Sequence, residues 1–155
     1  MFTGLDREIC AQAWDVIVPA IDKAAELGVS NGLRGSLIVL DPANPDPKNP
    51  LFTAHVGEFN QEFLTNVEGK VAVTIRTGLD SSRVRQDFPY LYRSGDIKYP
   101  GAIIREGLIV SFSGVQGDYD EMICEWMVAA IRAICRQGFS GHEGADSQPG
   151  AYLAG

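Results

Sequence analysis

The stretch that decides the fold is YPGAIIREGLIVSFSGVQGDYDEMICEWM, which spans residues 99–127. Two short apolar runs, residues 102–104 and 108–112, are joined by the charged turn Arg105-Glu106-Gly107. Apolar runs of this length on both sides of a turn that contains glycine are typical of a β-hairpin. The second run stops at a glycine-rich, acidic corner, and an apolar pattern of helical period follows directly. The stretch therefore predicts a hairpin that leads straight into a helix.

The corner between this hairpin and the helix is either a ligand cradle or a capped turn. Free N–H groups at a helix N-terminus favour anions. Asp118 and Asp120, however, already place negative charge in the first turn, where carboxylates cap such groups. Gly114 and Gly117 allow close packing of the backbone. We interpret the corner mainly as architecture, and we keep Ser113 and Asp120 as candidate walls of a pocket.

The helix after the corner is predicted to run from about residue 118 to 137. Its apolar residues recur at helical spacing, and the stripe around Trp126 is typical of a core or of a subunit interface. Residues 138–155 are rich in Gly, Ser and Ala. We therefore expect a flexible tail, or one that docks on a neighbouring subunit through Tyr152 and Leu153.

A second helix is predicted upstream, at residues 60–77, although its composition is ambiguous. The run Val71-Ala-Val-Thr-Ile favours a strand because its residues are mostly β-branched. The apolar positions nevertheless fall four apart, which is the spacing of one helix face. These positions are Phe59, Phe63, Val67, Val71 and Ile75. We expect the period to prevail over the propensity and Gly78 to end the helix.

The N-terminal part predicts a further helix, at residues 6–27, from apolar residues spaced three and four apart. Asp6 is its expected N-cap, and Gly28 is the residue expected to follow its C-terminus. Pro19 lies inside the pattern and removes one backbone donor. A kink or a break in the helix is therefore expected at Pro19.

Between the first two helices the sequence predicts another hairpin. Residues 34–40 and 51–56 have extended apolar patterns, and the ten residues 41–50 include four prolines, which must form a loop. The order is then helix, hairpin, helix, hairpin, helix. Because so few strands cannot bury both faces alone, we expect an α/β (α+β) fold with helices on a small antiparallel sheet of four to five strands.

Composition restricts the class of protein. With 155 residues, 21% charged and 45% hydrophobic, we expect one globular domain, residues 1–137. The net charge of −7 argues against binding to nucleic acid or to an anionic membrane surface. No apolar stretch has the length of a bilayer span, and the first residues lack the pattern of a signal peptide. Cys10, Cys124 and Cys135 are read as free thiols, so we expect a cytoplasmic protein.

The element order and four motifs resemble the GlcG/HbpS family of small haem-binding or haem-degrading-type proteins. The motifs are AAELGV, SLIVLD, GKVAVTIRTGLDSS and YPGAIIREGLIVSFSGVQGDYDE, and the resemblance covers roughly residues 10–135. It implies a profilin-like fold, a homo-oligomer and a small-molecule ligand, with haem as a possible cofactor. Two features depart from the family pattern: the long Pro-rich loop, and Ala54-His55-Val56-Gly57-Glu58 in place of an Arg-x-Asp.

The candidate site residues follow from this resemblance and from the residue types. Lys70 falls where the family has a lysine, and His55 is the candidate axial ligand, hence the candidate metal ligand. Lys70, Arg34 and Arg105 would then neutralise propionates, with Ser113 at the pocket wall. His142 lies in the tail and is expected to be solvated.

Two alternatives stay open. In the first, the protein is an enzyme that acts on a small organic acid in a catabolic pathway. Lys70 would hold the carboxylate of the substrate, and His55 or Asp120 would act as acid and base. In the second, the chain binds no ligand and is a non-catalytic assembly subunit built on the Trp126 face.

Overall fold

The computed structural model describes residues 1–143 and has the predicted helices and hairpins in the predicted order, with two short helical elements added between the second helix and the second hairpin. It contains four α-helices, one short 3-10 helix and four strands within those residues. Their bounds are α1 Arg7–Glu26, β1 Gly35–Leu40, β2 Phe52–Val56, α2 Gln61–Thr77, α3 Ser81–Asp87, η1 Pro89–Leu91, β3 Ala102–Arg105, β4 Leu108–Ser113 and α4 Gly117–Glu143.

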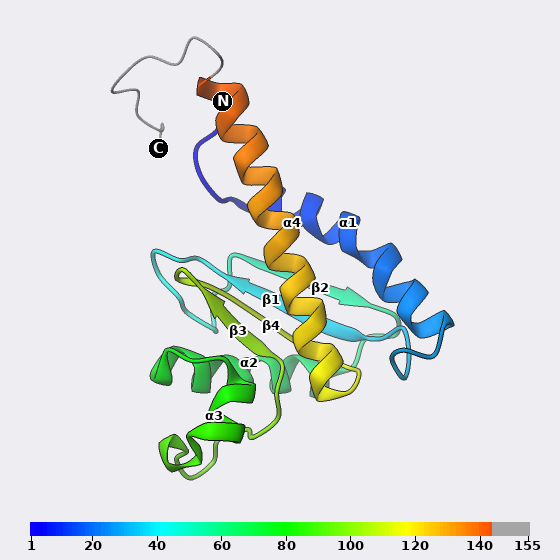
Figure 1. Ribbon diagram of the computed structural model, residues 1–155, viewed down its shortest axis with the longest axis vertical. Coiled ribbons are helices and arrows are strands. Elements are labelled where there is room, and N and C mark those ends of the chain that lie inside the picture. Colours follow the sequence, from blue (N-terminus) through cyan, green and yellow to red (C-terminus); the bar gives the residue numbers. More distant parts are fainter. Residues whose placement is uncertain (144–155) are drawn as a thin grey trace.

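The strands form one antiparallel sheet in the order β2-β1-β4-β3. Both predicted hairpins are present, as β1-β2 and β3-β4, and β1 pairs with β4 to join them. Helices α1 and α4 cover one face of the sheet, and α2 covers the other, with α3 beside it (Figure 1). The expected α+β fold with a four-stranded sheet is confirmed.

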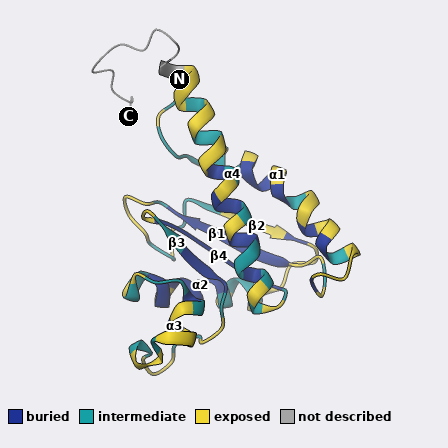
Figure 2. Ribbon diagram, viewed as in Figure 1, coloured by how far each residue is buried: buried dark blue, intermediate teal, exposed yellow. Residues whose placement is uncertain are grey.

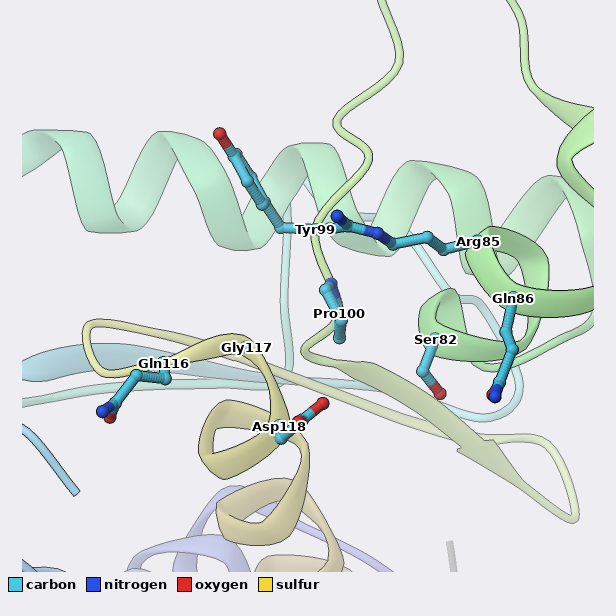
Figure 3. A pocket seen from close by; sticks show the side chains of 8 residues that line it. All are labelled: Ser82, Arg85, Gln86, Tyr99, Pro100, Gln116, Gly117 and Asp118. Atoms are coloured by element: carbon cyan, nitrogen blue, oxygen red, sulfur yellow. The ribbon is translucent and has the colours of Figure 1, made fainter. Parts of the chain in front are cut away.

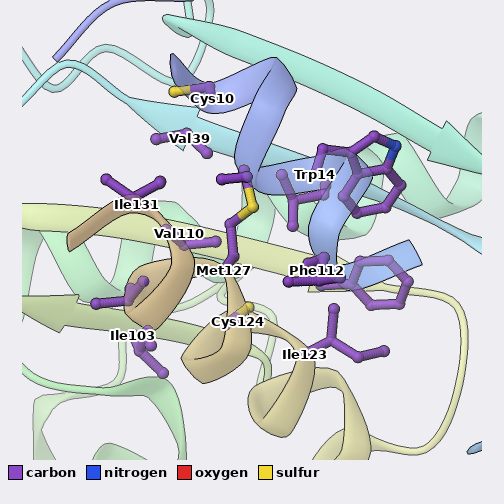
Figure 4. Packing of buried hydrophobic residues seen from close by; sticks show 14 of the residues in the cluster. Cys10, Trp14, Val39, Ile103, Val110, Phe112, Ile123, Cys124, Met127 and Ile131 are labelled. Carbon is purple, nitrogen blue, oxygen red and sulfur yellow. The ribbon is translucent and has the colours of Figure 1, made fainter. Parts of the chain in front are cut away.

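Every residue of the central strands β1 and β4 is buried (Figure 2). Because side chains alternate between the two faces of a strand, both faces of the sheet are buried here. On β1, Leu37 and Val39 pack under α1 and α4, while Ile38 packs under α2. The larger core cluster contains Trp14 of α1, Phe112 of β4 and Met127 of α4 (Figure 4). Burial on both faces explains why β1 reads as a continuous apolar run rather than as an alternating one.

Helix α2 forms at the ambiguous segment, as its period predicts. Val67 and Val71 are fully buried against the sheet, so packing of the apolar face outweighs the β-propensity of the segment. The helix ends at Gly78, whose φ of 70° is the left-handed conformation that glycine adopts readily. One expected member of the stripe is wrong: Phe59 precedes the helix and is 54% exposed.

Helix α1 is capped as expected, because the Asp6 carboxylate accepts the Ile9 N–H at 2.8 Å. Gly28 follows the C-terminus with a φ of 73°. The break considered at Pro19 does not occur, and the helix continues through it. Pro19 and Asp15, four residues earlier, are both exposed, so water can satisfy the carbonyl that loses its partner.

Helix α4 continues to Glu143, so the expected end at residue 137 is wrong. Phe139 packs edge-on against Phe2, with ring centroids 6.2 Å apart, and the N-terminal segment thereby supports the last turns. Residues 138–143, which the sequence assigns to the tail, are thus helical, and the rest of the predicted tail, with the proposed docking of Tyr152 and Leu153, lies outside the described residues.

The three cysteines are free, as predicted. Cys10 and Cys124 are fully buried, and burial raises the pKa of the Cys10 thiol to about 12, which leaves it protonated and unreactive. Among residues 1–143, no helix combines the length and the apolarity that crossing a bilayer requires.

Candidate functional site

Two glycines allow the ends of β1 and β4 to meet closely at the corner. Gly35 and Gly114 have φ values of 142° and 155°, and a Cβ on Gly114 would overlap the Gly35 backbone. This close approach supports the architectural interpretation of the corner. It also brings Arg34 alongside β4, where its Nε donates to the Gly114 carbonyl at 2.9 Å.

A buried ion pair lies beneath this corner. Lys70 Nζ is 2.9 Å from Asp120 Oδ2, and the two side chains are only 3% and 4% exposed. Lys70 also donates to the Phe112 carbonyl at 3.0 Å, and Asp120 Oδ1 accepts the Val115 N–H at 3.0 Å. The pair therefore joins α2, the end of β4 and the first turn of α4.

The backbone at Gly101 leaves the space that Lys70 occupies. Its φ is 133°, and a Cβ there would lie 2.6 Å from Lys70 Nζ and 3.1 Å from Asp120 Cβ. Only glycine combines this conformation with this contact. The glycine in the Pro-Gly-Ala motif is therefore explained by the ion pair that packs against it.

Burial raises the pKa of Asp120 to about 6, because desolvation disfavours its charged form. The charge and hydrogen bond of Lys70, and the N–H groups of Val115 and Gly114, act in the opposite direction and keep the pKa from rising further. A carboxyl group with such a pKa can exchange a proton near neutral pH.

Lys70 and Asp120 form part of the wall of an open cavity of about 330 Å³ between α2 and the corner. Its lining residues are Arg34, Phe63, Asn66, Lys70, Tyr99, Ser113, Gly114, Val115, Gly117 and Asp120. We call it the corner cavity. Of the two pocket-wall candidates proposed at this corner, Ser113 and Asp120, both line it.

The donors of the corner cavity are only partly used. An ammonium group has three N–H donors, and Lys70 commits two of them, to Asp120 and to Phe112. In the described part of the chain, the two Nη atoms of Arg34 make no hydrogen bond. With Asp120 ionised, Lys70 and Asp120 cancel, and the lining keeps the positive charge of Arg34. The cavity is therefore locally positive although the whole protein has a net charge of −7.

His55 lies apart from this cavity, on the edge strand β2. Its Nδ1 is 2.7 Å from Ser36 Oγ, and its ring meets Phe59 edge-on at 4.8 Å between centroids. In the sheet register Ser36 is opposite both His55 and Ser113, so the three residues form one row across the face under α2. The structure therefore does not bring His55 into direct contact with Lys70 and Asp120, as the enzyme alternative with His55 would need.

Arg105 lies at the opposite end of β4, beside the β3-β4 turn. Its Nη1 is 2.7 Å from Asp80 Oδ1, and its Nη2 is 2.7 Å from Glu125 Oε1. These two carboxylates already occupy the guanidinium, so Arg105 belongs with the paired surface charges rather than with the corner cavity.

Comparison with known proteins identifies the fold. No family model matches the chain, and no curated protein matches it significantly. Among solved structures, the Klebsiella pneumoniae protein ORFY, of the DUF336 family model, covers 80% of this chain and 88% of its own, with 17% identity and a TM-score of 0.57. A double mutant of Streptomyces reticuli HbpS covers 83% and 88%, with 19% identity and a TM-score of 0.54. This chain has the GlcG/HbpS fold.

A third structure with the GlcG/HbpS fold is a complex of PduOC with haem. It covers 79% of this chain and 89% of its own, with 17% identity and a TM-score of 0.51. Identities this low establish the shared architecture and do not transfer a ligand. The ligand of this chain has to be argued from its own residues.

Four residues of the corner cavity are not predicted as site residues by the sequence: Phe63, Asn66, Tyr99 and Val115. Phe63 and Asn66 precede the predicted Lys70 on α2 at spacings of three and four, so one helix face presents all of them, and this spacing is the signal that could have found them. Tyr99, 62% exposed, gives no signal beyond its place before Pro100.

Proposed function

We propose that this protein binds a small organic carboxylate in the corner cavity, with Arg34 as the principal partner of the anion. The observation that carries the proposal is the unpaired positive charge of this lining. The Lys70–Asp120 pair is neutral as a unit, and within residues 1–143 the Nη atoms of Arg34 have no hydrogen-bond partner. Guanidinium groups bind carboxylates through two parallel hydrogen bonds, which gives both affinity and orientation.

The rest of the lining supports the same class of ligand. The third N–H of Lys70, the Ser113 hydroxyl and the Asn66 amide can donate to oxygen atoms of the ligand. Phe63 supplies an apolar wall for a carbon skeleton. A few convergent polar groups on a partly apolar cavity of this size are typical of small-molecule sites.

Titration of the ¹⁵N-labelled protein with benzoate tests this proposal. We expect the amide resonances of Ser113, Gly114 and Val115 to shift in a saturable way. Arg34→Ala should weaken binding by about tenfold or more, the effect of losing a charged hydrogen bond. Arg83→Ala is the matched control, because Arg83 is also exposed but lines no wall of this cavity. Equal binding by the two variants would remove Arg34 from the site.

Haem is a second candidate ligand, and the geometry at His55 favours it. The contact of Nδ1 with Ser36 leaves Nε2 as the ring nitrogen that can ligate iron, and Phe59 offers an apolar surface beside it. His55 is exposed on an edge strand, so this chain covers one side of such a group. A second copy in the expected homo-oligomer would have to cover the other side.

Absorption spectra recorded during haemin titration separate this candidate from the carboxylate site. His55→Ala should abolish a saturable Soret shift if His55 ligates the iron. His142→Ala serves as control, since His142 is the only other histidine of the chain. Identical spectra from both variants would exclude His55 as the ligand, and the benzoate result would be unaffected.

A further inference from the structure

A larger cavity, of about 550 Å³, is drawn in Figure 3, and it shares two lining residues with the corner cavity. It is formed between α3 and the start of α4, with the loop before β3 between them. Its lining residues are Ser82, Arg85, Gln86, Tyr99, Pro100, Gln116, Gly117 and Asp118. We call it the α3 cavity. None of the roles considered so far uses it.

The two cavities are neighbours because they share Tyr99 and Gly117 in their walls. Gly117 packs so closely on the loop that a Cβ there would lie 2.9 Å from Pro100 Cδ. A side chain at position 117 would therefore collide with Pro100 where the walls of the two cavities meet. Tyr99 lines both cavities, and it is 62% exposed, so its ring is available to stack on a planar group.

The α3 cavity differs from the corner cavity in its chemistry. Arg85 and Asp118 bring one charge of each sign, so their charges cancel. Arg85 also donates to the Lys98 carbonyl at 3.3 Å, which holds it toward the loop. Figure 3 shows Ser82 and Gln86 together on α3, with the Asp118 carboxylate directed toward that side. Such a mixture of donors and acceptors suits neutral hydrogen-bonding groups such as amides or hydroxyls.

We infer that one ligand spans both cavities: an aromatic monocarboxylate whose acid group lies in the corner cavity, whose ring stacks on Tyr99, and whose far end carries an amide or hydroxyl group in the α3 cavity. This inference rests on the proposed carboxylate site and adds the size and the second recognition element of the ligand. Small-molecule sites have volumes of roughly 300–1,000 Å³. The volume of the corner cavity alone lies near the lower end of this range, whereas the combined volume of the two cavities lies in its upper part.

Two probes that differ only at the far end test the inference. Benzoate carries the acid and the ring, and 4-acetamidobenzoate adds an amide opposite the acid. Dissociation constants of both are measured by NMR titration for the wild type, for Gln86→Ala and for Gln137→Ala. Gln137 is an exposed helical glutamine distant from both cavities, which makes it the matched control.

We expect the wild type to bind 4-acetamidobenzoate about tenfold more tightly than benzoate, the gain that one or two hydrogen bonds provide. Gln86→Ala should lose most of this advantage and leave benzoate binding unchanged, while Gln137→Ala keeps it. Amides near Gln86 and Asp118 should shift with 4-acetamidobenzoate only. Equal affinity for the two probes, with benzoate still dependent on Arg34, would overturn the inference and leave the proposed function standing. Absence of benzoate binding would overturn both.

Discussion

Replacing Lys70 by Met tests what the buried ion pair contributes to the fold. The side chains of Lys70 and Asp120 are 3% and 4% exposed, and Nζ and Oδ2 lie 2.9 Å apart. Lys70→Met leaves Asp120 buried without its cation, a change that costs about 3–5 kcal/mol in other proteins. In a domain of this size, about 1 kcal/mol moves the Tm by roughly 2–4 °C. We therefore expect the variant to melt roughly 6–20 °C below the wild type.

The double variant Lys70→Met/Asp120→Asn removes both charges and keeps an oxygen that can accept the Val115 N–H. Because uncharged replacement of both partners is often neutral or stabilising, it should unfold within about 1 kcal/mol of the wild type. Asp120→Asn alone should be destabilised, since one amide oxygen must serve two donors. Urea unfolding, followed by the fluorescence of Trp14 and Trp126, measures all four proteins. If the double variant loses the sum of the two single losses, the side chains do not interact.

The pH dependence of Lys70→Met gives an independent check. Lys70 lowers the pKa of Asp120, against the burial that raises it to about 6. Without Lys70 the pKa of Asp120 in the folded state lies higher still. The stability that comes from protonated Asp120 is fully present below 3.8, the pKa of this carboxyl in the unfolded chain. It is lost as the pH rises through the folded pKa. The gap between wild type and variant should therefore be small near about pH 4.5 and complete near about pH 8. A gap of constant size would assign the loss to packing rather than to the ionisation of Asp120.

Three further predictions concern the backbone, a cap and assembly. Gly101→Ala should cost more in urea unfolding than Gly107→Ala: both share positive-φ strain of about 1–3 kcal/mol, but only at Gly101 would a Cβ lie 2.6 Å from Lys70 Nζ. Equal losses would contradict this. Asp6→Ala should lower stability by about 0.5–2 kcal/mol through loss of the α1 cap, and an unchanged midpoint would exclude that role. Sedimentation at micromolar concentration should show a homo-oligomer, because apolar side chains such as Phe139, 45% exposed, stay partly exposed among residues 1–143. A monomer would refute it.

The fold was predictable because its elements are specified locally. The four-residue period of α2 outweighs the β-branched composition of residues 71–75, and a buried helix face is what such a period requires. Both hairpins follow from short apolar runs and their turns. The end of α4 was missed because glycine at 138 suggests a stop, whereas its actual neighbour is the ring of Phe2, which lies 3.1 Å from the position of a Cβ there. That contact joins opposite ends of the chain and leaves no local signal.

The sequence predicted several residues of the candidate site, but it did not predict which of them contact one another. Lys70 and Asp120 were each singled out, one from the family resemblance and one from the corner, but they are 50 residues apart and their pairing depends on how α2 crosses β4. Arg34 and Arg105 look alike in the sequence, as cations at strand ends. The structure distinguishes them because Asp80 and Glu125 occupy only Arg105.

The double variant also separates the two roles that a buried pair can have in a GlcG/HbpS fold. A methionine and an asparagine can fill this space without two desolvated charges, so stability alone does not require the pair. What they cannot supply is the third N–H of Lys70 at the wall of the corner cavity. A double variant that folds as stably as the wild type but binds benzoate about tenfold more weakly would assign the pair to ligand binding. Unchanged binding in the same protein would assign it to the packing of α2, β4 and α4, and would leave Arg34 to hold the anion alone.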